Sequence, residues 1–135
     1  MKYLDTNIFL LPMLYEGDKA NKAKEILESM VEGNLQCATA SLTLDEFAWV
    51  IIKIKKNRKI AIEACKDILE LPNLKILAVS NTDVILALEY MEKYEQLKPR
   101  DAIHLAVCIN SGIFTIISDD SDFDNINEIN REDLD

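Results

Sequence analysis

The chain has 135 residues, 49% of them hydrophobic, and is long enough for a single domain spanning residues 1–135. Its longest apolar run, Phe47 to Ile52, is far below the roughly 18 residues of a membrane span, and the acid at position 5 breaks the order of a secretory signal, so we expect a cytoplasmic protein with no membrane partner. The formal net charge of −9 argues against a broad nucleic-acid-binding surface, although residues 119–135 alone carry −7 and leave −2 for residues 1–118.

Apolar spacing predicts short strands that alternate with helices. In chain order the expected elements are a strand (Lys2–Leu4), two helices (Asn7–Leu14 and Lys19–Val31), a strand (Leu35–Thr39), a helix from Ser41 or Thr43 to about Ile54, a helix from about Arg58 to Leu71, a strand (Leu74–Val79), a helix from Ser80 to about Tyr94, a helix from Pro99 to Gly112, and a strand (Ile113–Ile117). Strands separated by helices imply right-handed crossovers, so the expected fold is α/β, with a mainly parallel sheet and helices on both faces.

Several helix ends carry sequence signals. Asp18 is expected to cap the second helix, Pro12 to bend or end the first one, and Ser80 with Asp83 to begin the fifth. The segment Lys53–Lys59 holds five bases in seven residues. We interpret it as a solvated helix end favoured by the helix dipole, with a contact to phosphates as the alternative.

The three cysteines, Cys37, Cys65 and Cys108, are widely separated and odd in number. This spacing predicts neither a disulfide framework nor a zinc site. We expect small buried residues rather than a catalytic thiolate, because a thiolate needs a nearby base and His104 is the only histidine.

Four carboxylates spread along the chain are expected to lie at strand ends or in first helical turns: Asp5, Glu46, Asp101 and Asp120. Each has a structural explanation when taken alone. Asp5 could cap a helix, Glu46 could complete a capping box with Thr43, and Asp101 would be favoured by a helix dipole. Asp120 could belong to an acidic surface cluster.

Taken together, these acids favour a metal site. Two of them follow apolar strands at the ends where parallel sheets bind ligands. Carboxylates in one cleft repel one another and raise their own pKa values unless cations are present, and Mg²⁺ or Mn²⁺ are the hard ions that prefer oxygen ligands. Two such ions can activate water and stabilise the attacking and leaving oxygens of a phosphodiester.

Four segments together resemble the PIN-domain ribonucleases, and especially the nuclease toxins of the VapBC toxin–antitoxin type. These segments are Leu4–Asn7, Ser41–Glu46, Arg100–Ala106 and Ile117–Asp124, in the order that the family uses. The resemblance implies a PIN-like three-layer α/β/α sandwich with a central four- or five-stranded, mainly parallel sheet. It also implies a metal-dependent endoribonuclease with Mg²⁺ or Mn²⁺.

The resemblance further implies roles for particular residues. Asp5 and Asp101 would be principal metal ligands and catalytic residues, and Glu46 and Asp120 would complete the cluster. Asp122 is the second choice for the last position, in a loop that also holds Asp119 and Asp124. The residues expected to orient or support these ligands are Thr6, Asn7 and Ser118, and we expect His104 to pack behind them.

The expected partners are an RNA substrate, an antitoxin protein that covers the active site and a second copy of the chain in a homodimer. A housekeeping RNA-processing PIN nuclease would use the same residues, and a non-catalytic PIN-like protein-binding module would keep them without turnover. A haloacid-dehalogenase-like phosphatase is disfavoured because it needs Asp-x-Asp, whereas position 7 is Asn. A receiver-like signalling domain is disfavoured because Asp101 is expected to open a helix.

Overall fold

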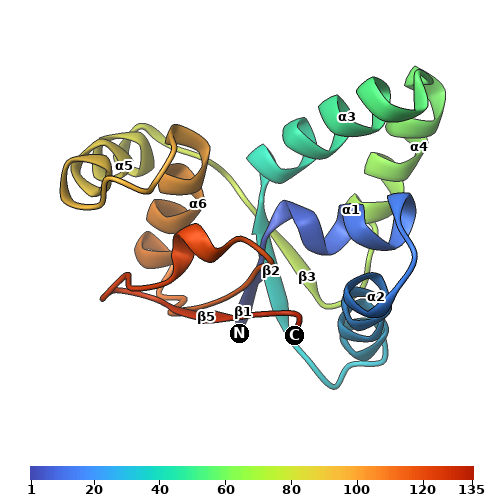
Figure 1. The fold of residues 1–135 in the computed structure, drawn as a ribbon, viewed down its shortest axis with the longest axis horizontal. Coiled ribbons are helices and arrows are strands. Elements are labelled where there is room, and N and C mark those ends of the chain that lie inside the picture. Colours follow the sequence, from blue (N-terminus) through green and yellow to red (C-terminus); the bar gives the residue numbers. More distant parts are fainter.

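Strands and helices alternate in the computed structural model, which describes residues 1–135 (Figure 1). The elements are β1 (Lys2–Leu4), α1 (Thr6–Leu14), α2 (Asp18–Val31), β2 (Cys37–Ala40), α3 (Ser41–Lys55), α4 (Arg58–Leu69), β3 (Leu74–Leu77), α5 (Asn81–Lys93), α6 (Pro99–Asn110), β4 (Thr115–Ile117), a short 3₁₀ helix η1 (Ser121–Phe123) and β5 (Asn130–Glu132). The predicted α/β class is confirmed. No helix is both long and apolar enough to cross a membrane.

The five strands form one sheet in the order β3-β2-β1-β4-β5, and every neighbouring pair is parallel. The chain moves outward from β1 through β2 to β3 and then returns to the other side of β1 to form β4 and β5. The direction of winding therefore reverses between β1 and β4. At such a switch point the loops after neighbouring strands diverge and leave a crevice, which is where open parallel sheets bind ligands.

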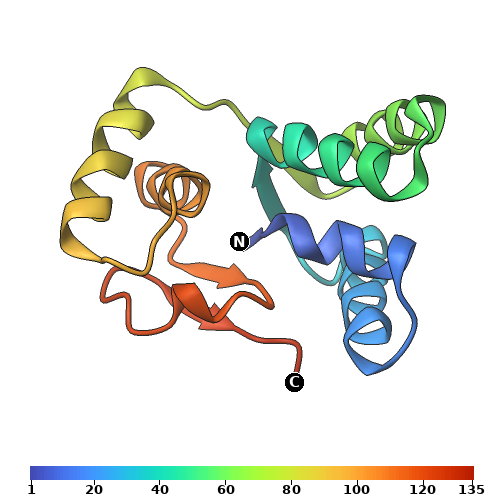
Figure 2. The same cartoon turned by 45° about the horizontal axis from the view of Figure 1, so that its top comes forward.

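Side chains that alternate along the strands supply two separate cores. Tyr3, Ala38 and Ile116 belong to the cluster that packs against α5 and α6. Leu4 and Cys37 belong to the cluster that packs against α1, α2, α3 and α4. Figures 1 and 2 show these two helical layers on opposite faces of the sheet. The predicted three-layer sandwich is therefore confirmed, with each face of the sheet buried by its own set of helices.

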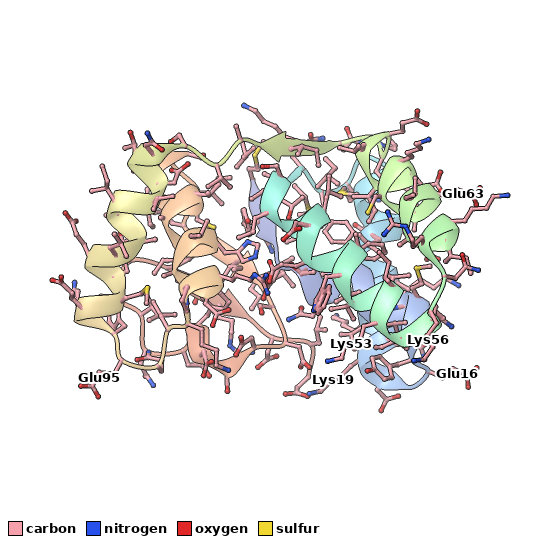
Figure 3. All side chains as sticks on the ribbon, turned by 90° about the horizontal axis from the view of Figure 1, so that it is seen from above. Glu16, Lys19, Lys53, Lys56, Glu63 and Glu95 are labelled. Carbon is pink, nitrogen blue, oxygen red and sulfur yellow. The ribbon has the colours of Figure 1, made fainter.

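Some predicted helix signals are confirmed. Ser80 caps α5 in a reciprocal capping box with Asp83, and Pro99 is the first residue of α6. The basic segment lies where α3 ends, with Lys53 and Lys55 in its last turn. In Figure 3 the labelled Lys53 lies at the end of α3 far from α6.

Two cap predictions are wrong. Asp18 is the first residue of α2, and Gly17 occupies the cap position without a side-chain hydrogen bond. The Thr43–Glu46 capping box does not form, because α3 begins at Ser41 and Thr43 is already inside the helix. The Thr43 hydroxyl instead lies 2.7 Å from that of Thr39 at the end of β2.

Several element boundaries differ from the predicted ones by one or two residues, and the polar strand β5 was not predicted from the residues. It lies at the edge of the sheet and pairs only with β4. A strand at the edge of a sheet has a neighbour on one side only and buries less apolar surface. Its sequence therefore need not alternate between apolar and polar residues, and this pattern does not predict it.

Candidate active site

The predicted site residues come from four separate elements that meet at the carboxyl ends of β1 and β4. Asp5 follows β1, and Ser118 and the acidic loop follow β4. Glu46 is in the second turn of α3, and Asp101 is in the first turn of α6. Figure 3 looks down on this edge of the sheet, with α3 and α6 on either side of it.

Asp5 is buried and firmly held. Its Oδ1 accepts a hydrogen bond from the Thr6 backbone N–H (2.8 Å), which caps α1. Its Oδ2 accepts hydrogen bonds from the Ser118 hydroxyl (2.6 Å) and the Asn7 side-chain amide (3.3 Å). Burial raises the pKa of Asp5, and the proximity of His104 together with these donors opposes part of that rise. Asp5 therefore caps α1 and also lies among the predicted site residues, two roles that the sequence analysis treated as alternatives.

Ser118 and Asn7 tie the end of β1 to the loop after β4. The Ser118 hydroxyl donates to Asp5 and accepts from the Asn7 amide (3.2 Å) and from the Asp120 backbone N–H (3.0 Å). The Asn7 side-chain oxygen accepts from the Asp119 backbone N–H (3.2 Å). With one donor and two acceptor sites used, the Ser118 hydroxyl is fully satisfied. Both residues therefore lie where they were predicted, in support of the acids.

Three carboxylates, those of Asp101, Asp120 and Asp122, form a tight cluster with oxygens that all lie within 4.8 Å of one another. Burial, followed by the charge of Asp120, raises the pKa of Asp101 to about 6. Mutual repulsion of this kind is what a bound cation would relieve. An all-oxygen set of carboxylates fits a hard divalent ion such as Mg²⁺ or Mn²⁺ and does not fit the nitrogen and sulfur ligands typical of zinc.

The structure separates the four acids of the loop after β4 into two pairs. Asp119 forms an ion pair with Lys19 (2.8 Å), and Asp124 accepts two hydrogen bonds from the Arg131 guanidinium (2.6 and 3.0 Å). Asp120 and Asp122 face Asp101 instead. The first and second choices from the sequence are therefore the two acids that join the cluster, and they do so together.

Glu46, on α3, is connected to the other site residues by hydrogen bonds with Thr6 and His104. Its Oε1 accepts a hydrogen bond from the Thr6 hydroxyl (3.0 Å) and is hydrogen-bonded to Nε2 of His104, which also lies 3.9 Å from Oδ1 of Asp5. Burial alone would raise the pKa of Glu46, but the hydrogen bond with His104, aided by Thr6 and the charge of Arg100, lowers it. Burial alone would lower the pKa of His104, but Glu46 and the nearby carboxylates raise it.

Tyr3 is the site neighbour that the sequence did not reveal. Its hydroxyl lies 2.5 Å from Nδ1 of His104 and accepts a hydrogen bond from the Ala40 backbone N–H (3.1 Å). A tyrosine in a short apolar strand is typical of core packing, so nothing in its spacing indicated a polar contact. The position of His104 one helical turn after Asp101 was the only signal for this part of the site.

The cysteines stay outside this chemistry. Cys37 and Cys108 are buried, and all three are free thiols. Burial raises the pKa of Cys37 to about 11. The expectation of small buried residues is confirmed for Cys37 and Cys108, while Cys65 is only half-buried.

A three-layer α/β/α fold with a carboxylate cluster at its switch point is typical of metal-dependent hydrolases that act on phosphate esters. The family model described as PIN domain matches residues 2–129, and the chain belongs to this family.

The relatives of this chain are ribonucleases by name. It is 30% identical over 111 residues to the VapC ribonuclease Mb1869c of Mycobacterium bovis and to ribonuclease VapC13 of Mycobacterium tuberculosis, covering 81% of this chain and 82% of each relative. Among solved structures it resembles VapBC2 of Rickettsia felis bound to a promoter DNA fragment (TM-score 0.76, 21% identity, 100% of both chains). It also resembles VapC20 of Mycobacterium tuberculosis, a toxin that cleaves the sarcin–ricin loop (TM-score 0.74, 16% identity, 96% of this chain and 97% of the other).

Proposed function

We propose that this PIN domain, residues 1–135, is a Mg²⁺- or Mn²⁺-dependent endoribonuclease of the cytoplasm and the toxin of a toxin–antitoxin pair. The observation that carries the proposal is the cluster of Asp101, Asp120 and Asp122 at the switch point of the sheet, which Ser118 links to Asp5, in a chain 30% identical to named VapC ribonucleases. Within this proposal, Asp5, Glu46, Asp101 and Asp120 are the catalytic residues.

The carboxylates of Asp101, Asp120 and Asp122 would hold the ion or ions, together with Asp5 and Glu46. A bound divalent ion supplies a Lewis acid that makes water more acidic and offsets the negative charge of the scissile phosphate. The chain itself fixes the ligands. Ser118 and Asn7 hold Asp5, and Thr6 holds Glu46, so little reorganisation is needed when substrate binds.

A cavity of about 440 Å³ beside the acids supports a role in binding RNA. It is lined by Glu46, Lys98, Pro99, Arg100 and Asp101. Lys98 and Arg100 are exposed and form no ion pair with an acid of the chain, although the charge of Arg100 acts on Glu46. The positive side chains of Lys98 and Arg100 lie next to carboxylates that are expected to bind metal. There they could contact the phosphates that flank a scissile bond in RNA.

We expect Arg100→Gln to raise KM for a single-stranded RNA severalfold while changing kcat little. The change should also flatten the dependence of log kcat/KM on log salt by about 0.7, because one phosphate contact is lost. Lys66→Gln, at an exposed base on α4 outside the Lys53–Lys59 segment, is the control. An unchanged salt slope in Arg100→Gln would show that Arg100 does not contact the RNA backbone.

The activity itself is tested by incubating the purified protein with labelled RNA and Mn²⁺, with and without EDTA. Cleavage that begins with the metal, stops with EDTA and returns when Mn²⁺ is added in excess is the expected result, because the acids cannot polarise water without an ion. Cleavage that persists in EDTA would contradict metal dependence. Absence of cleavage on total cellular RNA under all conditions would favour a protein-binding role.

The toxin assignment and the partners rest on the similar solved structures that hold an antitoxin, among them VapBC2 of Rickettsia felis. We propose an antitoxin that covers the acidic site, and a homodimer of this chain. Apolar residues exposed on α5, namely Val84, Ile85 and Leu88, offer surface for such contacts. A gene for a small DNA-binding protein directly upstream, whose product abolishes cleavage, would separate a toxin from a housekeeping nuclease.

A further inference from the structure

A buried chain of hydrogen bonds runs from the backbone at the end of β2 to the Glu46 carboxylate. The Ala40 N–H donates to Oη of Tyr3, which lies 2.5 Å from Nδ1 of His104, and Nε2 of His104 is bonded to Oε1 of Glu46. Tyr3 is 0% exposed and His104 is 1% exposed, so water cannot replace either partner. We call this set of contacts the Tyr3–His104 relay.

The first member of the relay makes the Tyr3 hydroxyl oxygen an acceptor and leaves its hydrogen free to be donated. A backbone N–H can only donate, so Oη of Tyr3 accepts from Ala40. In the direction that we infer, the hydroxyl hydrogen of Tyr3 points to Nδ1 of His104, which lies 2.5 Å from the hydroxyl oxygen. With Nδ1 accepting, the neutral ring carries its proton on Nε2 and donates it to Glu46.

The relay distinguishes the two oxygens of Glu46. The hydroxyl of Thr6 and Nε2 of His104 both bond to Oε1. Oε2 has no hydrogen-bond partner within the protein, and the side chain keeps 20% of its surface exposed. The carboxylate therefore cannot rotate freely, and Oε2 is the oxygen that it presents to a ligand.

We propose that Tyr3 and His104 are positioning residues, which hold Glu46 by Oε1 so that Oε2 faces the bound cation or the substrate. This inference rests on the proposed function, because it assigns Glu46 a ligand. Stability alone does not require the relay, since apolar residues of similar shape can replace both partners of a buried hydrogen bond almost without loss. Hydrogen bonds that orient the ligands of a metal, in contrast, affect metal affinity directly.

The direction of the relay is tested on the unchanged protein by nitrogen-15 NMR, because His104 is the only histidine and its ring signals need no assignment. In Mg²⁺-saturated protein at pH 8 we expect a protonated Nε2 and a bare Nδ1. Tyr3→Phe should weaken this preference, and Tyr15→Phe, an exposed tyrosine after α1, should leave it unchanged. A ring protonated on Nδ1 alone, with a bare Nε2 that cannot donate to Glu46, would overturn the relay.

The positioning role is tested by calorimetric titration of Mn²⁺ into the RNA-free protein. His104→Met fills the space without a donor and should weaken Mn²⁺ binding by about 10-fold, whereas His104→Gln retains an N–H near the position of Nε2 and should restore most of the affinity. In a Glu46→Gln background, His104→Met should have no further effect, because it acts through Glu46. Thermal melts of each variant confirm that it is folded.

The outcomes separate this inference from the proposed function. Wild-type affinity in His104→Met, or an equal loss in the Gln and Met variants, would overturn the positioning role and leave the nuclease assignment intact. A wild-type protein that bound no Mn²⁺ would overturn the metal-dependent function and the inference with it.

Discussion

Asp5→Asn is expected to lower kcat/KM for RNA cleavage by at least about 100-fold. The substitution removes the negative charge from the most buried carboxylate of the site. It also places an amide where Oδ1 and Oδ2 now accept from Thr6, Ser118 and Asn7. An amide has only one acceptor oxygen, so the supporting donors lose a partner and the ligand set loses a charge.

The matched control for this prediction is Asp45→Asn, which neutralises an exposed acid beside Glu46. It should retain wild-type cleavage. Both proteins are compared by steady-state cleavage in Mn²⁺, and their melting temperatures show whether each is folded. Comparable activity in folded Asp5→Asn and wild-type protein would place the chemistry at another site or in a contaminant.

Asp101→Asn is expected to reduce cleavage by a similar factor of about 100 while making the metal-free protein more stable. The folded-state pKa of Asp101 is raised to about 6, so the native state binds a proton more tightly than the unfolded chain does. Stability is therefore lost as the pH rises from about 4 through 6, and the full penalty applies at pH 7.5. With allowance for solvent screening of this half-exposed group, the asparagine should recover about 1 kcal/mol.

Thermal melts in EDTA at pH 7.5 and pH 5 check the second prediction. The variant should melt about 3 °C above wild type at pH 7.5, and the difference should shrink at pH 5, where Asp101 is largely protonated. Added Mn²⁺ should stabilise wild type and not the variant. Asp67→Asn, an exposed acid on α4, should shift neither melt. A variant less stable than wild type at pH 7.5 would contradict the repulsion inferred for the cluster.

Much of this architecture could be predicted from the sequence because its signals are local. Apolar spacing located β1, β2, β3 and β4, and each of their predicted ranges overlaps the observed one. Ser80 and Pro99 marked helix starts correctly because capping and the missing proline N–H are properties of single residues. The strand β5 was not found, since its Asn-Arg-Glu sequence shows no hydrophobic alternation.

The sequence indicated candidate members of the site and could not indicate the contacts between them. Motif positions indicated Asp5, Glu46, Asp101 and Asp120, but they could not show that Thr43 and Glu46 fail to form a cap. That outcome follows from the start of α3 at Ser41, and the contacts that Glu46 makes instead, with Thr6 and His104, join residues that are distant in the sequence. Two of the four acids of the loop pair with bases, Asp119 with the distant Lys19 and Asp124 with Arg131 on β5, a strand that was not predicted.

The central place of β1 in the sheet has a consequence for synthesis on the ribosome. β1 is made first, but its partner β4 is made more than a hundred residues later, and Asp101, Asp120 and Asp122 all lie in the last third of the chain. A nascent chain that has not yet emerged beyond β4 can form α1 to α4 and still lacks most of the acids. The carboxylate cluster of the site therefore cannot assemble until translation is almost finished.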